Sequence, residues 1–300
     1  MYRQIARNKR WSVTLIVFFA LVITGIGAWL SISSASVWPL VVLLAFCGVY
    51  VWWQLRSATK HAARSAGCVE VGPSEEPRLH RVVDTLAIRA GIPKPIVCVI
   101  EDDAANAFAA AMRPDDAVVG VTRGTLRLLD DTELEGVIAH EVAHIVNYDS
   151  RVKITTFALV GSVAAIAAAL AFIGWALIGT RAKGGAAMVA LTLGIGSLCL
   201  AAIFGTAAFL LGPLISSGVS RQREYLADAS AAELTRHPDG LSRALRKIEA
   251  QGSQLARPVA ATSQFFFANP LRRGWLSALL DSHPSTAKRV ERLTFMEANF

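Results

Sequence analysis

Two histidines four residues apart, with a glutamate directly after the first, are the residues best suited to chemistry in this 300-residue chain. They form the pentapeptide His140-Glu141-Val142-Ala143-His144. On a helix, side chains at positions i and i+4 share a face at a spacing of roughly 5 to 6 Å, so both imidazoles can reach one zinc ion. Glu141 lies on nearly the same face, where a carboxylate can act as general base toward water at the metal. The pentapeptide therefore predicts zinc-assisted hydrolysis.

The residues around the pentapeptide predict that it lies inside a helix. Residues 130–135 are mostly acidic and include a Thr132-x-x-Glu135 capping box, which is typical of a helix start. Apolar residues then recur at helical spacing and predict a buried face beside the two histidines: Leu134, Ile138, Val142 and Ile145.

Two histidines need a further partner, because catalytic zinc sites usually take three protein ligands and leave a fourth position for water. Positions 147 and 150 are Asn147 and Ser150, so the third histidine of a metzincin is absent. We expect a carboxylate from another helix, and Glu224 in residues 220–228 is the candidate. Asp228 shares a helical face with Glu224 and can orient a ligating imidazole.

The composition indicates a membrane protein. Hydrophobic residues make up 53% of the chain and charged residues only 18%, below the roughly 25% of a typical soluble domain. Four uncharged stretches are each near or above the roughly 20 residues that span a bilayer: 11–30, 37–55, 155–180 and 184–220. The first exceeds the usual length of a signal-peptide core and a second follows at once, so we expect an uncleaved anchor. The last can tilt, or include a re-entrant end near Gly212-Pro213.

The distribution of charge predicts the orientation. Basic residues flank the first two stretches on their outer sides, at Arg3, Arg7, Lys9, Arg10, Arg56, Lys60 and Arg64, whereas the loop between the stretches is uncharged. By the positive-inside rule, both termini and residues 56–154 and 221–300 are expected in the cytoplasm, although Arg181 and Lys183 lie on the other side. The net charge of +7 then fits attraction to anionic lipid. The chain has no basic cluster interleaved with aromatic residues, so the sequence does not predict nucleic-acid binding.

Several separate motifs stand in an order that resembles one known family. They are Asn106-Ala107-Phe108-Ala109, the predicted helix over 133–149, the segment 220–228, and His283-Pro284-Ser285 followed by Arg289. Together they resemble the integral-membrane zinc proteases of the HtpX and CAAX prenyl protease type I group, over residues from about 70 to the C-terminus. One departure is Ala110-Ala111, where HtpX-like chains commonly have Thr-Gly.

The resemblance and the composition together predict a mainly α protein with a small β-sheet. We expect four transmembrane helices and a cytoplasmic α+β protease domain of the zincin type, specifically a gluzincin. The expected parts are two transmembrane helices in 1–56, the first part of the protease domain in 57–154, a transmembrane hairpin in 155–219, and the second part of the domain in 220–300. Within the domain we expect a helix over 76–90, a strand over 96–100, and a hairpin of 106–112 with 117–122.

The resemblance implies peptide hydrolysis with one zinc ion per chain. His140, His144 and Glu224 are expected to bind the metal, while Glu141 takes a proton from water and passes one to the leaving amine. The edge strand of the hairpin is expected to bind an extended substrate by strand addition. Asn106 either bonds the substrate backbone or is an ordinary turn-entry asparagine.

The group that stabilises the oxyanion is open at this point. His283 and Arg289 are candidates carried over from the family's C-terminal motif, and Tyr225 is a further one; His283 could instead make a local cap or turn contact. The run Phe265-Phe266-Phe267 is either an interfacial anchor or part of the domain core.

The expected substrates follow from where the metal lies. About 11 residues separate His144 from the third apolar stretch, which places the metal within roughly 15 to 20 Å of the bilayer. The many charges around the motif exclude an intramembrane protease. The resemblance implies quality control of membrane proteins in a plasma or inner membrane, as part of a stress response. The partners are then protein substrates and the lipid bilayer.

Two alternatives remain. One is a protease that processes prenylated C-termini, and the other is a non-enzymatic membrane scaffold with a structural metal. The intact Glu141 favours catalysis, because a structural zinc needs no general base.

Overall fold

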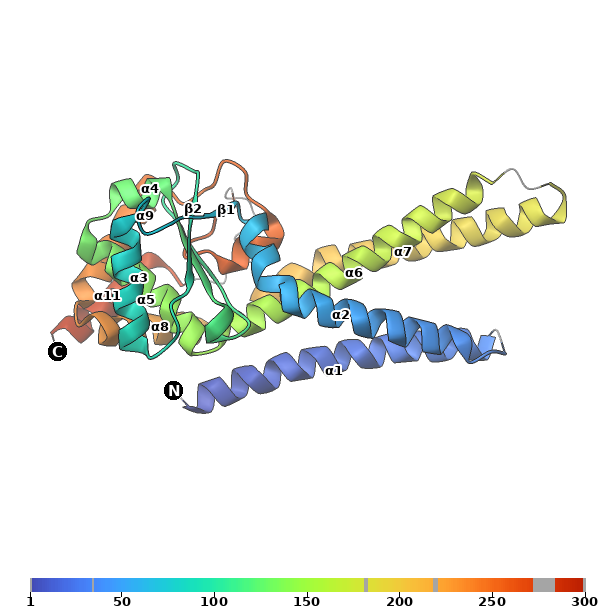
Figure 1. Cartoon of the computed structure of the whole chain (residues 1–300), viewed down its shortest axis with the longest axis horizontal. Helices are drawn as coiled ribbons and strands as arrows, with labels where there is room; N and C mark the ends of the chain where they lie inside the picture. The colour runs from blue at the N-terminus through green and yellow to red at the C-terminus, as the bar shows by residue number, and fades with distance from the viewer. Residues whose placement is uncertain (1, 34, 181–182, 218–220, 272–283, 299–300) are drawn as a thin grey trace.

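Two pairs of long helices project from a smaller domain that contains a sheet (Figure 1). The computed structural model describes residues 2–33, 35–180, 183–217, 221–271 and 284–298. The long helices are α1 (Tyr2–Ser33), α2 (Trp38–Ser65), α6 (Asp149–Ile178) and α7 (Gly185–Ser217). α1 packs against α2 and α6, and α6 packs along α7.

Three helices among the described residues are long and apolar enough to cross a membrane: Leu40–Ser65, Asp149–Ile178 and Gly185–Thr206. They match the second, third and fourth predicted stretches. The first predicted stretch lies inside α1, which is helical throughout but is not one of the three, and several of its side chains lie outside the described part. The four-span count therefore stays a prediction. A re-entrant end near Gly212-Pro213 was one of two predicted alternatives, and α7 continues there as a helix to Ser217.

The domain is built around a four-stranded sheet with the order β1-β2-β4-β3. Its strands are β1 (Cys68–Glu70), β2 (Ile96–Ile100), β3 (Ala107–Ala110) and β4 (Val118–Thr122). The strand over 96–100 and the β3–β4 hairpin are confirmed, with β3 antiparallel to β4 at one edge of the sheet. The turn between them contains the short 3-10 helix η1 (Pro114–Asp116). β1, which the sequence did not predict, has only three residues and pairs antiparallel with β2.

Side chains of the sheet alternate between two buried layers, because successive residues of a strand point to opposite faces. On β3, Ala107 and Ala109 belong to the larger core with α3 and α5, whereas Phe108 and Ala110 face a second cluster. That second cluster includes the last turns of α2 and Ile154 at the start of α6. The strands β3 and β4 and most of β2 are thus buried on both faces, whereas β1 is largely exposed, and the long helices join one of these faces.

The remaining helices of the domain are α3 (Pro77–Ala90), α4 (Arg123–Leu128), α5 (Asp131–Val146), α8 (Arg221–Thr235), α9 (Pro238–Gln251), the 3-10 helix η2 (Ala260–Phe265) and α11 (Thr286–Glu297). α3 confirms the helix expected over 76–90, and Gly91 ends it in the left-handed conformation at φ 65°.

α5 carries the pentapeptide, as expected, but its cap differs from the predicted one. Asp130 is the N-cap: its side chain accepts from the Glu133 backbone, and the Glu133 side chain accepts from the Asp130 backbone. The helix begins two residues earlier than the Thr132-x-x-Glu135 box requires, so Thr132 already lies inside it. Leu134, Ile138, Val142 and Ile145 are buried, as predicted.

α5 passes close to α9 because both helices carry a glycine at the crossing. A Cβ on Gly136 would lie 2.7 Å from the backbone nitrogen of Leu241, and one on Gly240 would lie 2.7 Å from the carbonyl oxygen of Thr132. Backbone atoms cannot give way at such distances, so the two glycines fix the position of α5 in the domain.

Candidate metal centre

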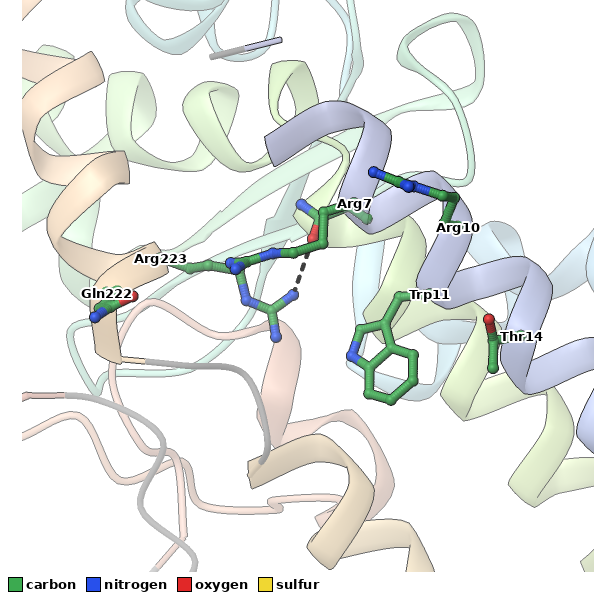
Figure 2. Close-up of a pocket in the computed structure, with 7 residues that line it drawn as sticks. Arg7, Arg10, Trp11, Thr14, Gln222 and Arg223 are labelled. Carbon is green, nitrogen blue, oxygen red and sulfur yellow. Dashed lines mark hydrogen bonds between the residues drawn. The ribbon is translucent and has the colours of Figure 1, made fainter. Parts of the chain in front are cut away.

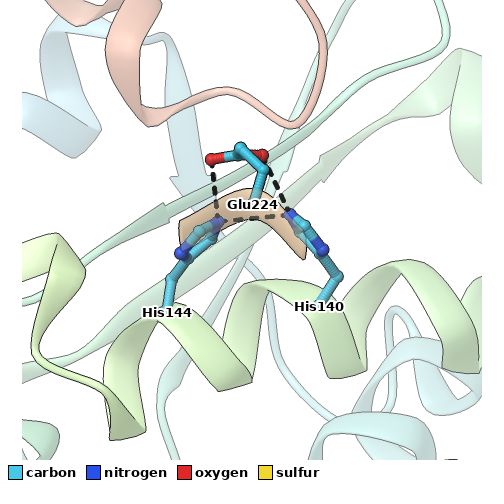
Figure 3. Close-up of side chains that lie close together, drawn as sticks. All are labelled: His140, His144 and Glu224. Atoms are coloured by element: carbon cyan, nitrogen blue, oxygen red, sulfur yellow. Dashed lines mark hydrogen bonds and ion pairs between the residues drawn. The ribbon is translucent and has the colours of Figure 1, made fainter. Parts of the chain in front are cut away.

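Two helices bring three potential metal ligands together. His140 and His144 lie one turn apart on α5, and Glu224 projects toward them from α8 (Figure 3). One nitrogen or oxygen from each residue lies within 4.8 Å of the other two, and all three side chains are buried. The two helices are about 80 residues apart in sequence, with the α6–α7 hairpin between them.

The spacing of these atoms fits zinc. A tetrahedral zinc ion with bonds of about 2.0 to 2.2 Å places neighbouring ligand atoms about 3.3 to 3.5 Å apart. Here the two imidazole Nε2 atoms are 3.2 Å apart, and the Glu224 carboxylate oxygens lie 3.4 Å from His144 Nε2 and 3.6 Å from His140 Nε2. Two imidazoles and one carboxylate are also the ligand set of a catalytic zinc site.

A carboxylate and a guanidinium support His140 from behind. Asp228, one turn after Glu224 on α8, has an oxygen 2.9 Å from His140 Nδ1. Arg289 on α11 donates to both carboxylate oxygens of Asp228, at 2.9 and 2.6 Å. A carboxylate on the far nitrogen of a ligating histidine fixes the ring's orientation and tautomer. The predicted position of Asp228 beside an imidazole thus matches the geometry, and Arg289 stands behind Asp228.

Asp228 and Arg289 keep each other in the charged form. Burial by itself raises the pKa of Asp228, but the Arg289 guanidinium and the His140 ring outweigh it and lower that pKa to about 2. Burial lowers the pKa of Arg289, but Asp228 outweighs it and the pKa is raised overall. Burial also lowers the pKa of His144, which favours the neutral imidazole that a metal binds.

His144 is supported by Asp149, a residue to which the sequence reasoning gave no role. An oxygen of Asp149 lies 3.2 Å from His144 Nδ1, and the Asp149 side chain is completely buried. Between α5 and α6, Tyr148 adopts a left-handed conformation at φ 59°, and this turn brings the start of α6 back to the histidine. The available signal was chemical: each ligating imidazole needs a partner for its other nitrogen, and Asp149 is only five residues away.

The first helix of the chain also reaches this centre. The Asn8 amide on α1 donates to the other Asp149 oxygen at 2.7 Å and to the Asn147 carbonyl at 2.9 Å. Arg223, next to Glu224, has Nη1 3.7 Å from Asp149. No local sequence pattern indicates a contact between residues 141 positions apart.

An aromatic ring and a strand-like segment border the ligands on the sheet side. The Phe267 ring lies edge-on to His140, with 5.1 Å between ring centroids, and under the Arg289 guanidinium at 5.0 Å. The Phe267 backbone donates to the Ala107 carbonyl at 2.8 Å, and Phe266 forms an antiparallel bridge with Phe108. Residues 265–268, here named the edge segment, thus lie along the outer edge of β3. The phenylalanines are 1 to 2% exposed, so of the two predicted roles the core position is the observed one.

Asn106 has a position that differs from the predicted substrate contact. Its side chain is completely buried, and the amide donates to the carbonyls of Ser253 and Ala268 at 3.0 and 2.8 Å. The amide oxygen accepts from the backbone of Ala107 and Ala268, each at 3.0 Å. Both polar atoms therefore bind this chain's own backbone, because the edge segment covers the place at the start of β3 where a substrate was expected.

The other predicted site residues do not all lie at the metal centre. Glu141 is buried on α5, beside the ligands. The Tyr225 ring packs under the Arg292 guanidinium at 3.6 Å and is only partly buried. His283 lies outside the described residues. In the part that the structure describes, the predicted ligands, Asp228 and Arg289 come together, and Tyr225 faces a different partner.

Comparisons with known proteins identify the family of this chain. The model of peptidase family M48 matches residues 73–297, which include all three candidate ligands. A protein named "Protease HtpX homolog" from Streptococcus uberis is 36% identical over 99% of this chain and 100% of its own length. Proteins with the same name from Tropheryma whipplei and Listeria innocua are 35% and 37% identical, over 100% and 99% of this chain and the whole of their own lengths. The crystal structure of S. mikatae Ste24p aligns with a TM-score of 0.47 at 18% identity, over 98% of this chain and 67% of that one. The family match and the full-length relatives show that this chain belongs to peptidase family M48 as an HtpX-like membrane metalloprotease.

Proposed function

We propose that this protein is a zinc endopeptidase that cleaves cytoplasmic segments of membrane proteins. One observation carries the proposal: the side chains of His140, His144 and Glu224 are buried, with 3.2 to 3.6 Å between their nitrogen and oxygen atoms, close to the spacing in a tetrahedral zinc site, and they come from helices on either side of the apolar α6–α7 hairpin. Such a centre is attached directly to the membrane region, so chains at the bilayer surface reach it most easily.

The residues of this chain divide the catalytic work. His140, His144 and Glu224 would hold one zinc ion, which would polarise a carbonyl and lower the pKa of water. Glu141 accepts a proton from the attacking water and returns one to the leaving amine. Asp228 and Asp149 orient the imidazoles of His140 and His144. Arg289 keeps Asp228 ionised; an oxyanion role for Arg289, His283 or Tyr225 remains a proposal.

A substrate is proposed to bind in extended form along the outer edge of β3, where backbone groups give affinity regardless of side chains. The edge segment occupies that place through the Phe266–Phe108 bridge and the bond from Phe267 to Ala107. We therefore propose that the edge segment leaves β3 when a substrate binds. Backbone pairing lost by one strand is then replaced by the other.

The orientation is proposed from the charges that flank the helices. Arg7, Lys9 and Arg10 lie at the start of α1, and Arg56 and Arg64 lie toward the end of α2, on the side of the domain. Basic residues favour the cytoplasmic side, so we place the domain and both termini there. α1 is proposed as the fourth span, and the division at residues 56, 154 and 219 into membrane and cytoplasmic parts is kept.

Quality control of membrane proteins is the proposed biological role, and it rests on the HtpX relatives. No observation favours a protease for prenylated C-termini. A scaffold with a structural metal would not need Glu141, whose burial beside two ligands suits a general base.

The test is the substitution Glu141→Gln in the full-length protein purified in detergent or reconstituted in vesicles. We expect about one zinc per chain in both proteins, and a loss of at least about 100-fold in cleavage of an unfolded protein substrate by the variant. Glu135→Gln is the matched control, since Glu135 lies on the same helix but pairs with Arg89 at the surface, at 2.6 Å. Equal cleavage by Glu141→Gln and wild type would refute the proposed mechanism.

A further inference from the structure

A pocket of about 430 Å³ lies between the first turns of α1 and the start of α8. Figure 2 shows its side chains, which come from both helices: Arg7, Arg10, Trp11 and Thr14 from α1, and Gln222 and Arg223 from α8. Asn8 completes the lining. None of these residues belongs to the ligand set, and the proposed proteolysis gives the pocket no role.

The pocket carries an excess of positive charge. Three guanidinium groups line it, and no carboxylate does so among the described residues. Arg223 is 4% exposed and lies 3.5 Å from the Asn8 amide oxygen. Arg7 and Arg223 carry like charges and both line the pocket, while Asp149 lies 3.7 Å from Arg223 Nη1. An anion between Arg7 and Arg223 would relieve their repulsion.

The pocket lining on α1 is followed along the helix by exposed apolar side chains. Trp11 is 52% exposed, and large exposed apolar side chains follow it along the helix: Val13, Val17, Phe18 and Leu21. Tryptophan is enriched where a membrane meets water, and basic pockets between transmembrane helices on the cytoplasmic side bind anionic headgroups. With α1 in the membrane as proposed, the cationic donors would lie at the level of the headgroups and the apolar face of α1 at the level of the acyl chains.

We propose that this pocket binds the phosphate of one anionic phospholipid, with Arg7, Arg10 and Arg223 around the headgroup and the acyl chains along α1. A phosphodiester carries one negative charge and several acceptor oxygens, which match the planar donor array of guanidinium groups. The inference rests on the proposed position of α1 in the membrane.

The bound lipid would support the metal centre, because two residues that line the pocket adjoin that centre. Arg223 directly precedes Glu224 in the chain, and Asn8 connects α1 to Asp149, which bonds His144. A headgroup that bridges Arg7 and Arg223 holds α1 against α8. The lipid thus keeps Asn8 in contact with Asp149.

The test uses the full-length protein in nanodiscs that contain equal parts of phosphatidylglycerol and phosphatidylcholine, with retained lipid identified by native mass spectrometry. We compare wild type with Arg7→Gln/Arg10→Gln, both of which change exposed side chains. The matched control is Arg56→Gln/Arg64→Gln, which removes the same charge from exposed positions near the end of α2. Arg7→Lys/Arg10→Lys keeps the charge in place. Far-ultraviolet circular dichroism reports folding in every variant.

We expect wild type to retain one phosphatidylglycerol in preference to phosphatidylcholine, and Arg7→Gln/Arg10→Gln to lower this preference about tenfold or more. The control pair should stay within about threefold of wild type, and the lysine pair should fall between wild type and Arg7→Gln/Arg10→Gln, because it keeps the charge but not the planar donors. Equal losses in Arg7→Gln/Arg10→Gln and the control pair would overturn the proposal, since the effect would then be general surface charge. Displacement of the lipid by inorganic phosphate would also overturn it, in favour of a soluble phosphate-bearing ligand. Because lipid retention is measured without cleavage, its failure is distinguishable from a failure of the proteolytic function.

Discussion

Substitution of Asp149 tests whether the metal centre extends beyond its three ligands. The Asp149 carboxylate is completely buried, with one oxygen 3.2 Å from His144 Nδ1 and the other 2.7 Å from the Asn8 amide. Arg223 Nη1 lies 3.7 Å away. Asp149→Asn keeps the shape of the side chain but removes its charge, and only one oxygen remains for two donors.

The expected loss follows from the role of carboxylates behind ligating histidines. Removing such a partner typically lowers metal affinity about 10- to 100-fold, or about 1.4 to 2.7 kcal/mol. We place Asp149→Asn in this range. We also expect it to lower thermal stability, because the buried Arg223 loses the neighbouring carboxylate charge. The assay is competition for zinc between the purified full-length protein and a chelator of known affinity.

Two controls make the result specific. Asp131→Asn makes the same chemical change on α5, but Asp131 is 76% exposed and pairs with Arg78, so zinc affinity should not change. Asp228→Asn removes the partner of the other imidazole, and we expect a similar loss. If Asp149→Asn bound zinc within about twofold of wild type, the contact with His144 would have no role in metal binding and the reasoning would be refuted.

Three further predictions concern the frame of the site. Gly136→Ala should lower the free energy of unfolding by about 1 to 3 kcal/mol, because its Cβ meets the Leu241 backbone at 2.7 Å; an unchanged melting temperature would contradict the close crossing of α5 and α9. Asn106→Ala should lower thermal stability and expose the edge segment to limited proteolysis, since the amide bonds Ser253 and Ala268; a raised KM with normal stability would instead indicate the substrate contact expected from sequence. Removal of zinc by a chelator should lower the melting temperature of the full-length protein, and zinc should restore it while magnesium should not, because the ligands join two helices.

The sequence predicted the parts of the site that depend on local spacing or on known coordination chemistry. The two histidines and Glu141 follow from one helical turn, and the burial of Ile138 and Val142 follows from the same period. Glu224 could be predicted although it lies far from the pentapeptide in sequence. A catalytic zinc site needs a third ligand, and no third histidine follows the pentapeptide at the metzincin spacing.

The remainder could not be predicted because it depends on contacts between distant segments. Asn8 and Asp149 are 141 positions apart, and neither residue type announces the contact. The cap of α5 was placed two residues late because Asp130 and Thr132 both suit an N-cap, and only the position of the helix decides between them. The position of the edge segment could not be predicted either, because Phe266 pairs with β3 through backbone groups that every residue has.

These distant contacts indicate that α1 does more than anchor the enzyme in the membrane. A helix that only anchors a protein in a bilayer needs no buried polar side chain, because polar groups in contact with lipid are costly. On α1, however, Asn8 and Ser12 are 1% and 0% exposed, and Asn8 bonds both the turn after α5 and the carboxylate behind His144. The candidate metal centre is therefore connected to a series of contacts that begins at Asn8 on α1, passes through Asp149 and reaches Arg223 on α8. We infer that α1 and the metal centre form one unit in folding, so that a lipid bound beside Arg7 acts on the same equilibrium as the zinc.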